Sequence, residues 1–90
     1  MQGAFTISWS ASAQRDLAKL PEKVATAVVE FIYGGLAGNP RRVGRELTLE
    51  LAGVHSARRG DFRVLYRITE DQDVVTVVNI DHRADGYRRR

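Results

Sequence analysis

The residues of this chain that could do chemistry are arginines, and they are concentrated in its second half. Of the 14 lysines and arginines, eleven lie after residue 40, and all eleven are arginines. The stretch HSARRGDFRVLYRI, residues 55–68, holds four of them beside a histidine. A guanidinium group can donate two parallel hydrogen bonds to a phosphate and can stack on a base. This half of the chain therefore predicts a surface that binds a polyanion such as a nucleic acid.

Two roles without a polyanion stay open for these arginines. A bias towards arginine codons would leave the charges simply solvated. Surface salt bridges would pair them with carboxylates of the same half, at a gain of about 0–1 kcal/mol for each pair. The carboxylates in question are Glu46, Glu50, Asp61, Asp81 and Asp85.

A strand predicted over residues 61–69 decides where these arginines point, because side chains alternate between the two faces of a sheet. One face of this strand carries Phe62, Val64, Tyr66 and Ile68. Burial contributes roughly 1.5–3 kcal/mol for each of these side chains and so fixes the register against the helices. Arg63 and Arg67 must then lie on the opposite, open face. The preceding strand adds to that face either Arg58 or the set His55, Ala57 and Arg59.

The elements that carry this strand follow from changes in hydrophobic period. Residues 4–9 predict a first strand, and Ser10 or Ser12 can cap the helix that follows it. A second helix starts at Pro21, carries one apolar stripe and ends at the paired glycines of YGGLAGNP, residues 33–40. Residues 41–53 are ambiguous, with an extended pattern from Leu47 to Leu51. Residues 54–59, 61–69 and 73–81 predict three further strands joined by short turns.

These elements predict an α+β fold in which the N-terminal strand and an αα-hairpin pack on one face of a small, mostly antiparallel four-stranded sheet. Ninety residues with a net charge of +3 fit one domain over residues 1–90. The chain has no cysteine and no apolar run of about 18 residues. We therefore expect a cytoplasmic protein that uses no disulfide and enters no membrane.

Four segments together are similar to the RelE/ParE superfamily of bacterial toxins, and to its RelE-like branch, particularly actinobacterial RelE-like toxins. The segments are QRDLAKLPEKV, NPRRVGREL, HSARRGDFRVLYRI and DHRADGY. The most specific part is ARRGDFRVLYRI, which looks like the core motif R-x-G-D-Y-R-V-x-Y of the family. The resemblance covers nearly all of residues 5–88 and implies a small toxin of a toxin–antitoxin system.

The resemblance implies an endoribonuclease that cuts messenger RNA in the ribosomal A site by attack of the 2′-hydroxyl, without a metal or other cofactor. It implies three kinds of partner: a cognate RelB-like antitoxin, the ribosome with its mRNA, and operator DNA reached only through the antitoxin complex. Carried over by position, the catalytic residues would be Arg63, Arg83, Tyr87 and Arg58. Further contacts to RNA would come from Arg59, Arg67, His55 and His82.

Two alternatives share the same fold, which does not by itself decide function. The first is inhibition of DNA gyrase, as in ParE-like toxins, against which the set of arginines argues. The second is a catalytically weakened toxin that acts through antitoxin binding and operator repression. It is raised by Ser56, which stands where RelE enzymes carry a lysine.

Overall fold

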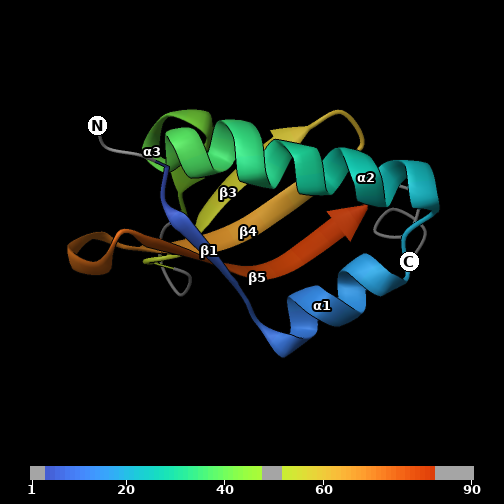
Figure 1. Ribbon diagram of the computed structural model, residues 1–90, viewed down its shortest axis with the longest axis horizontal. Coiled ribbons are helices and arrows are strands. Elements are labelled where there is room, and N and C mark those ends of the chain that lie inside the picture. The colour runs from blue at the N-terminus through green and yellow to red at the C-terminus, as the bar shows by residue number, and fades with distance from the viewer. Residues whose placement is uncertain (1–3, 48–51, 83–90) are drawn as a thin grey trace.

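A five-stranded sheet in the order β1-β5-β4-β3-β2 frames the protein (Figure 1), whose computed structural model describes residues 4–47 and 52–82. β1 runs parallel to β5, and the other neighbours are antiparallel. The strands are β1 (Thr6–Trp9), β2 (Arg45–Glu46), β3 (His55–Arg59), β4 (Phe62–Thr69) and β5 (Val74–His82). The helices are α1 (Ala11–Ala18), α2 (Glu22–Phe31), the π-helical turn η1 (Ile32–Leu36), α3 (Pro40–Val43) and the 3₁₀ turn η3 (Glu70–Gln72).

The predicted α+β fold is confirmed, with five strands in place of the four expected. The additional strand is β2, in which Arg45 pairs with Ser56 and Glu46 pairs with His55. Two residues are too few to produce an alternating pattern that a sequence would reveal. Residues 48–51 of the predicted extended segment lie outside the described residues.

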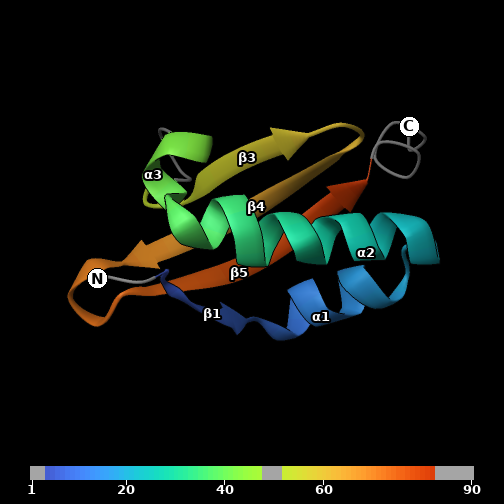
Figure 2. The same cartoon turned by 45° about the horizontal axis from the view of Figure 1, so that its top comes forward.

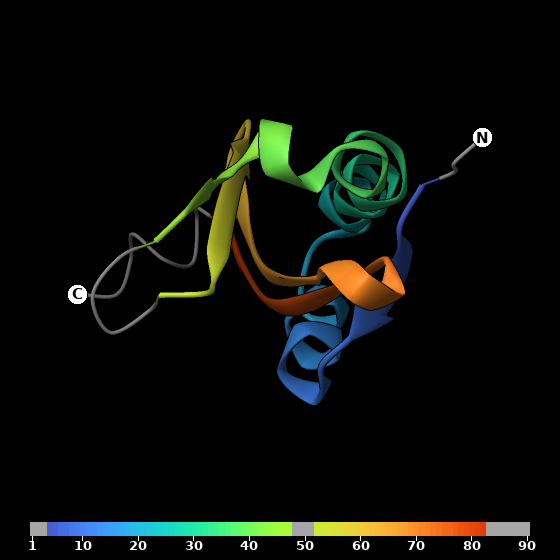
Figure 3. The same ribbon diagram turned by 90° about the vertical axis from the view of Figure 1, so that its left-hand side faces the viewer.

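α2 crosses one face of the sheet, and Figure 3 shows it end-on against the concave side. The core beneath it contains the predicted apolar face of β4: Phe62, Val64 and Tyr66 are buried, and Ile68 is half-buried. Arg63 and Arg67 are exposed on the other face, as predicted. Further core side chains come from β5 and the helices, namely Val75, Val77, Ile80, Val28, Ile32 and Leu36.

The prediction that the paired glycines end the second helix was wrong. The helix continues past α2 as the π-helical turn η1, which contains Gly34 and Gly35. Ile32 and Leu36 of this turn are both fully buried. Their burial outweighs the roughly 1 kcal/mol that a glycine costs in a helix interior. The chain leaves the helix at Asn39, whose backbone is no longer helical, as expected for the residue before a proline, and Pro40 then begins α3.

A β-bulge in β5 changes which of its side chains face the core. The register between β4 and β5 shifts at Leu65/Tyr66, so that Tyr66 pairs with Val77 whereas Leu65 pairs with Asn79. The extra residue, Val78, lets Val77 and Ile80 both point into the core, where strict alternation would separate them.

α1 lies alongside β5, beyond the end of β1 (Figure 2). Ser10 caps the helix by accepting a hydrogen bond from the Ala13 amide at 3.0 Å, and its hydroxyl donates to the Val78 carbonyl at 2.7 Å. Asp16 accepts a hydrogen bond from the Ile80 amide at 2.9 Å. β1 no longer pairs with this part of β5, so the side chains of Ser10 and Asp16 provide the hydrogen-bond partners of the Val78 carbonyl and the Ile80 amide.

No helix in the described parts of the chain has the length and apolar character needed to cross a membrane.

We expect Ser10→Ala to lower the free energy of unfolding by about 1 kcal/mol or somewhat more, because the loss of a helix cap costs that much and a second hydrogen bond goes with it. Urea denaturation measures the change. Ser8→Ala, which removes an exposed hydroxyl from β1, is the matched control and should change stability little. Equal stability of the two variants would contradict the double role of Ser10.

Candidate nucleic-acid interface

The open face of the sheet gathers arginines from three neighbouring strands. Arg58 of β3 lies directly opposite Arg63 of β4. Arg45 of β2 lies opposite Ser56 of β3, which in turn lies opposite Leu65 of β4. Residues that are paired across a sheet share a face. Of the two sets that the sequence allowed for β3, the structure therefore places Arg58 on the open face beside Arg63.

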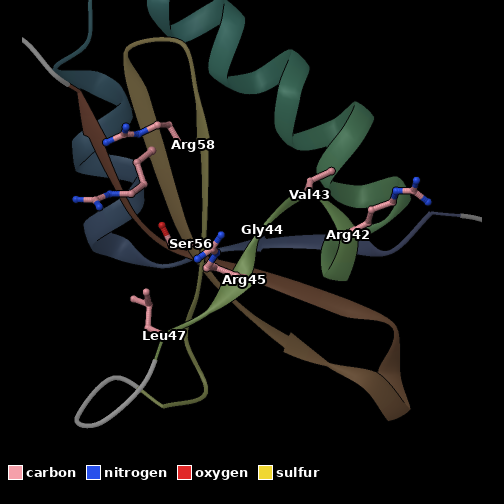
Figure 4. A pocket seen from close by; sticks show the side chains of 8 residues that line it. Arg42, Val43, Gly44, Arg45, Leu47, Ser56 and Arg58 are labelled. Carbon is pink, nitrogen blue, oxygen red and sulfur yellow. The ribbon is translucent and has the colours of Figure 1, made fainter.

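A hollow of about 600 Å³ lies where these residues meet (Figure 4). In Figure 4 the side chains of Arg58, Ser56, Arg45 and Leu47 follow one another along the hollow, whereas Arg42 extends from α3 away from Ser56. The volume of the hollow falls within the range of roughly 300–1,000 Å³ that is typical of small-ligand sites. The lining residues are Arg42, Val43, Gly44, Arg45, Leu47, Ser56, Arg58 and Arg63.

The electrostatics of this face are unfavourable in the free protein. Arg58 and Arg63 are like charges in directly opposed positions, an arrangement that destabilises a sheet. Arg63 Nη2 lies 3.3 Å from Asp81 Oδ2, but both side chains are about half exposed, at 47% and 50%. Such a surface pair contributes about 0–1 kcal/mol. An anion bound between the guanidiniums would relieve the remaining repulsion through charge-assisted hydrogen bonds.

The other predicted RNA-contacting residues are spread more widely. Arg67 shares the open face, but it lies four residues from Arg63 along β4, about 13 Å at the rise of a strand. His82 pairs with Phe62, which puts it on the helix side of the sheet, where it is half-buried. Arg83 and Tyr87, which the family resemblance implies as catalytic residues, lie outside the described residues.

His55 and Arg59 do not join the open face. His55 is buried, with 7% of its surface exposed, and its ring stacks on Tyr66 at a centroid distance of 5.4 Å. The Arg59 guanidinium lies 5.3 Å from the centre of the Phe31 ring on α2. Because β3 alternates, both side chains point towards the helices when Arg58 points away from them. We therefore leave His55 and Arg59 out of the candidate interface.

Arg42 and Arg45 belong to the hollow but were not singled out from the sequence. The short strand β2 gave no periodic signal, and the only hint was RRVGREL, in which Gly44 separates two arginines from a third. The segment is held in place by one nearby contact and one that is distant in sequence. The Leu47 amide donates to the Val54 carbonyl at 2.8 Å, and Arg41 Nε forms an ion pair with Glu70 Oε2.

Comparison with known proteins gives a consistent assignment. Residues 7–87 match the family described as ParE toxin of type II toxin–antitoxin system, parDE. The chain is 51% identical over 85 residues to Toxin RelG of Mycobacterium tuberculosis, covering 94% of this chain and 98% of the relative. It is 46% identical over 84 residues to Toxin RelE of the same organism, covering 93% and 87%.

Solved structures extend this similarity to three dimensions. A chain in the crystal structure of the toxin–antitoxin complex RelBE2 from Mycobacterium tuberculosis matches with a TM-score of 0.90 and 47% identity, covering 94% of this chain and 98% of that one. The isolated Escherichia coli RelE toxin matches with a TM-score of 0.72, 15% identity and coverage of 93% and 92%. At that identity the second match shows a shared fold.

We expect Arg58→Gln to raise the melting temperature at low ionic strength, because it removes the repulsion of Arg63 across the strands. The gain should be a few tenths of a kcal/mol up to about 1 kcal/mol, or up to several degrees for a domain of this size. Inorganic phosphate should stabilise the original protein more than the variant, with chloride used to match the ionic strength. Arg15→Gln, an exposed change on α1, is the control. An equal response of all three proteins to phosphate would show that the pair binds no anion.

Proposed function

Because the chain belongs to the RelE/ParE family of toxins from type II toxin–antitoxin systems, we propose that it is a ribosome-dependent endoribonuclease that cleaves messenger RNA in the ribosomal A site. The chain is a toxin of the RelBE type, and the cleavage reaction is the function that its open face supports best. The observation that carries the proposal is the opposed pair Arg58 and Arg63, with Arg45 in the same hollow.

In the proposed reaction the ribose 2′-oxygen attacks the adjacent phosphorus. A bond from the 2′-oxygen to phosphorus forms and the bond to the 5′-oxygen breaks, which leaves a 2′,3′-cyclic phosphate and a 5′-hydroxyl end. The 2′-hydroxyl loses a proton and the leaving 5′-oxygen gains one. The enzyme must align the attack, stabilise the charged phosphorane and assist these two proton transfers.

Guanidinium groups suit the second of these tasks. Arg63 and Arg58 would each donate hydrogen bonds to the non-bridging oxygens of the scissile phosphate, where negative charge increases in the transition state. Neither can act as a general base, because an arginine side chain scarcely deprotonates. We assign proton transfer to Tyr87 and a further phosphate contact to Arg83. Both assignments rest on the family resemblance.

Arg45 bears on the alternative of a weakened enzyme. Ser56 stands where the resembling enzymes carry a lysine, and Arg45 is its direct neighbour across β2 and β3. A guanidinium at this place would restore a cation to the hollow. This placement favours an active ribonuclease over a toxin that acts only through its antitoxin. Arg67 would contact the RNA further along the same face.

We further propose that a cognate RelB-like antitoxin neutralises the toxin in the cytoplasm and that operator DNA is bound through the complex of the two. Structures of relatives were solved as such complexes, including RelBE2 of Mycobacterium tuberculosis and the RelE–RelB complex of Pyrococcus horikoshii. A net charge of +3, with the excess in the second half of the chain, favours an antitoxin segment that is acidic.

The family description names ParE toxins, so gyrase inhibition is the second candidate.

We expect Arg63→Ala to abolish growth inhibition and to lower ribosome-dependent cleavage at least about a hundredfold, since loss of one preorganised donor to a charged transition state costs that much. Primer extension on mRNA after induction measures the cuts, and Arg15→Ala is the control. Circular dichroism should show both variants folded. Uncut messages together with inhibited DNA supercoiling would favour the gyrase candidate instead.

Asp81 competes with the substrate for Arg63 in this proposal. We expect Asp81→Asn to tighten binding of an uncleavable RNA, with the attacking 2′-hydroxyl replaced by hydrogen, by about threefold to tenfold at low salt, because one negative charge leaves the face. Fluorescence anisotropy measures the Kd. The control is Asp71→Asn in η3, an exposed site of equal charge. Weaker binding by the Asp81 variant would mean that the carboxylate orients Arg63 rather than opposing the RNA.

A further inference from the structure

The segment that carries Arg42 and Arg45 has little regular structure to hold it. α3 has four residues and β2 has two, so few backbone hydrogen bonds of a helix or a ladder fix their positions. Yet Arg45 must sit opposite Ser56 to share the hollow with Arg58 and Arg63. Further constraint on this segment can come from side chains elsewhere in the fold.

Tyr66 supplies such a constraint from the centre of β4. Its side chain is fully buried, and its hydroxyl donates a hydrogen bond to the Pro40 carbonyl at 2.6 Å across 26 residues of sequence. Burial raises the pKa of Tyr66 to about 12, although the nearby Arg41 guanidinium lowers it. The hydroxyl therefore stays protonated, and remains a donor, throughout the physiological range. The Pro40 carbonyl opens α3, so this bond fixes the start of the segment.

Gly44 shows how closely the same segment passes over Tyr66. A Cβ atom at position 44 would lie 2.4 Å from the Tyr66 hydroxyl oxygen and 2.6 Å from the Ser56 carbonyl oxygen. Neither neighbour can move easily, because one belongs to a buried ring and the other to the backbone of β3. Figure 4 shows the chain running from Val43 through Gly44 to Arg45 beside Ser56. The glycine is required here by close approach of the chain to Tyr66 and β3.

The ring of Tyr66 is itself held from the neighbouring strand. His55 stacks on it with an angle of 25° between the ring planes. This contact gives a structural reason for a buried histidine within an arginine-rich strand. A chain of contacts thus runs from His55 on β3 through the buried Tyr66 to Gly44 in the segment that bears Arg45.

We propose that Tyr66 is a positioning residue of the interface, whose hydroxyl holds Arg45 in register with Arg58 and Arg63 by binding the Pro40 carbonyl beneath Gly44. Tyr66 touches no substrate in this proposal and acts through Arg45. The inference rests on the proposed function for its effect on RNA. Its structural half, the control of the α3–β2 segment by one buried hydroxyl, can be tested without RNA.

The test is a double-mutant cycle between Tyr66→Phe and Arg45→Ala, read as the Kd for an uncleavable RNA with the attacking 2′-hydroxyl replaced by hydrogen. In the original protein Arg45→Ala should weaken binding about fivefold to tenfold, as the loss of a phosphate contact does. In the Tyr66→Phe background it should weaken binding less than about twofold, because Arg45 is already out of register. Arg67→Ala is the matched control, and its effect should be the same in both backgrounds. Additive effects of Tyr66→Phe and Arg45→Ala would overturn the proposal.

Amide hydrogen exchange of Leu47, whose amide bonds to the Val54 carbonyl, tests the structural half. Tyr66→Phe should speed this exchange at least about tenfold while leaving β5 amides protected. Gly44→Ala should act in the same way from the other side, and it replaces Tyr66→Phe if that variant does not fold. Unchanged exchange in the folded variant would overturn the proposal. Faster exchange in a protein that binds no RNA would support the positioning and reject the proposed function.

Discussion

The alternation of β4 is the constraint on which the rest of this structure depends. Phe62, Val64 and Tyr66 are buried on one side, so the backbone geometry of a strand leaves Arg63 no position except the other side. Burial of those three side chains is worth several kcal/mol in total. Repulsion between exposed guanidiniums is worth a fraction of that. Burial of the core therefore determines where the arginines lie, even though this places like charges close together.

This order of magnitudes explains why a small protein can maintain a self-repelling surface. Arg58 and Arg63 oppose each other across two strands, and the Asp81 carboxylate offsets part of their repulsion from a half-exposed position. An anion bound between the two side chains would relieve what remains of this repulsion. Functional sites commonly retain such local instability at the expense of overall stability. Register, rather than the number of arginines, thus sets the charge of the interface, since the adjacent Arg59 lies over Phe31 on the other side.

The parts of the fold that were predictable from sequence are those in which local pattern and burial agree. β4 alternates over eight residues and β5 is nearly all apolar at its centre, and the ends of both strands were predicted within one residue. The parts that were not predictable depend on distant contacts. Gly34 and Gly35 are typical of a helix stop, but the turn that contains them is buried through Ile32 and Leu36. In the site, the sides taken by Arg63 and Arg67 followed from alternation along β4, whereas the sides that Arg58 and His55 take required the register of β3.

Arg45 was the least predictable member of the site, and the reason is physical. A two-residue strand has no period of its own, so its place is decided by what the chain around it contacts. The chain before β2 contacts Tyr66, which the sequence correctly identifies as a core residue. The sequence does not reveal that the Tyr66 hydroxyl binds the Pro40 carbonyl. One side of Tyr66 is thus part of the hydrophobic core, and its polar end fixes a cation on the opposite surface. Tyr66→Phe keeps the buried ring and so preserves the packing of the core, but it removes the hydroxyl that positions Arg45. Packing of the core and placement of this charge therefore depend on different atoms of the same side chain.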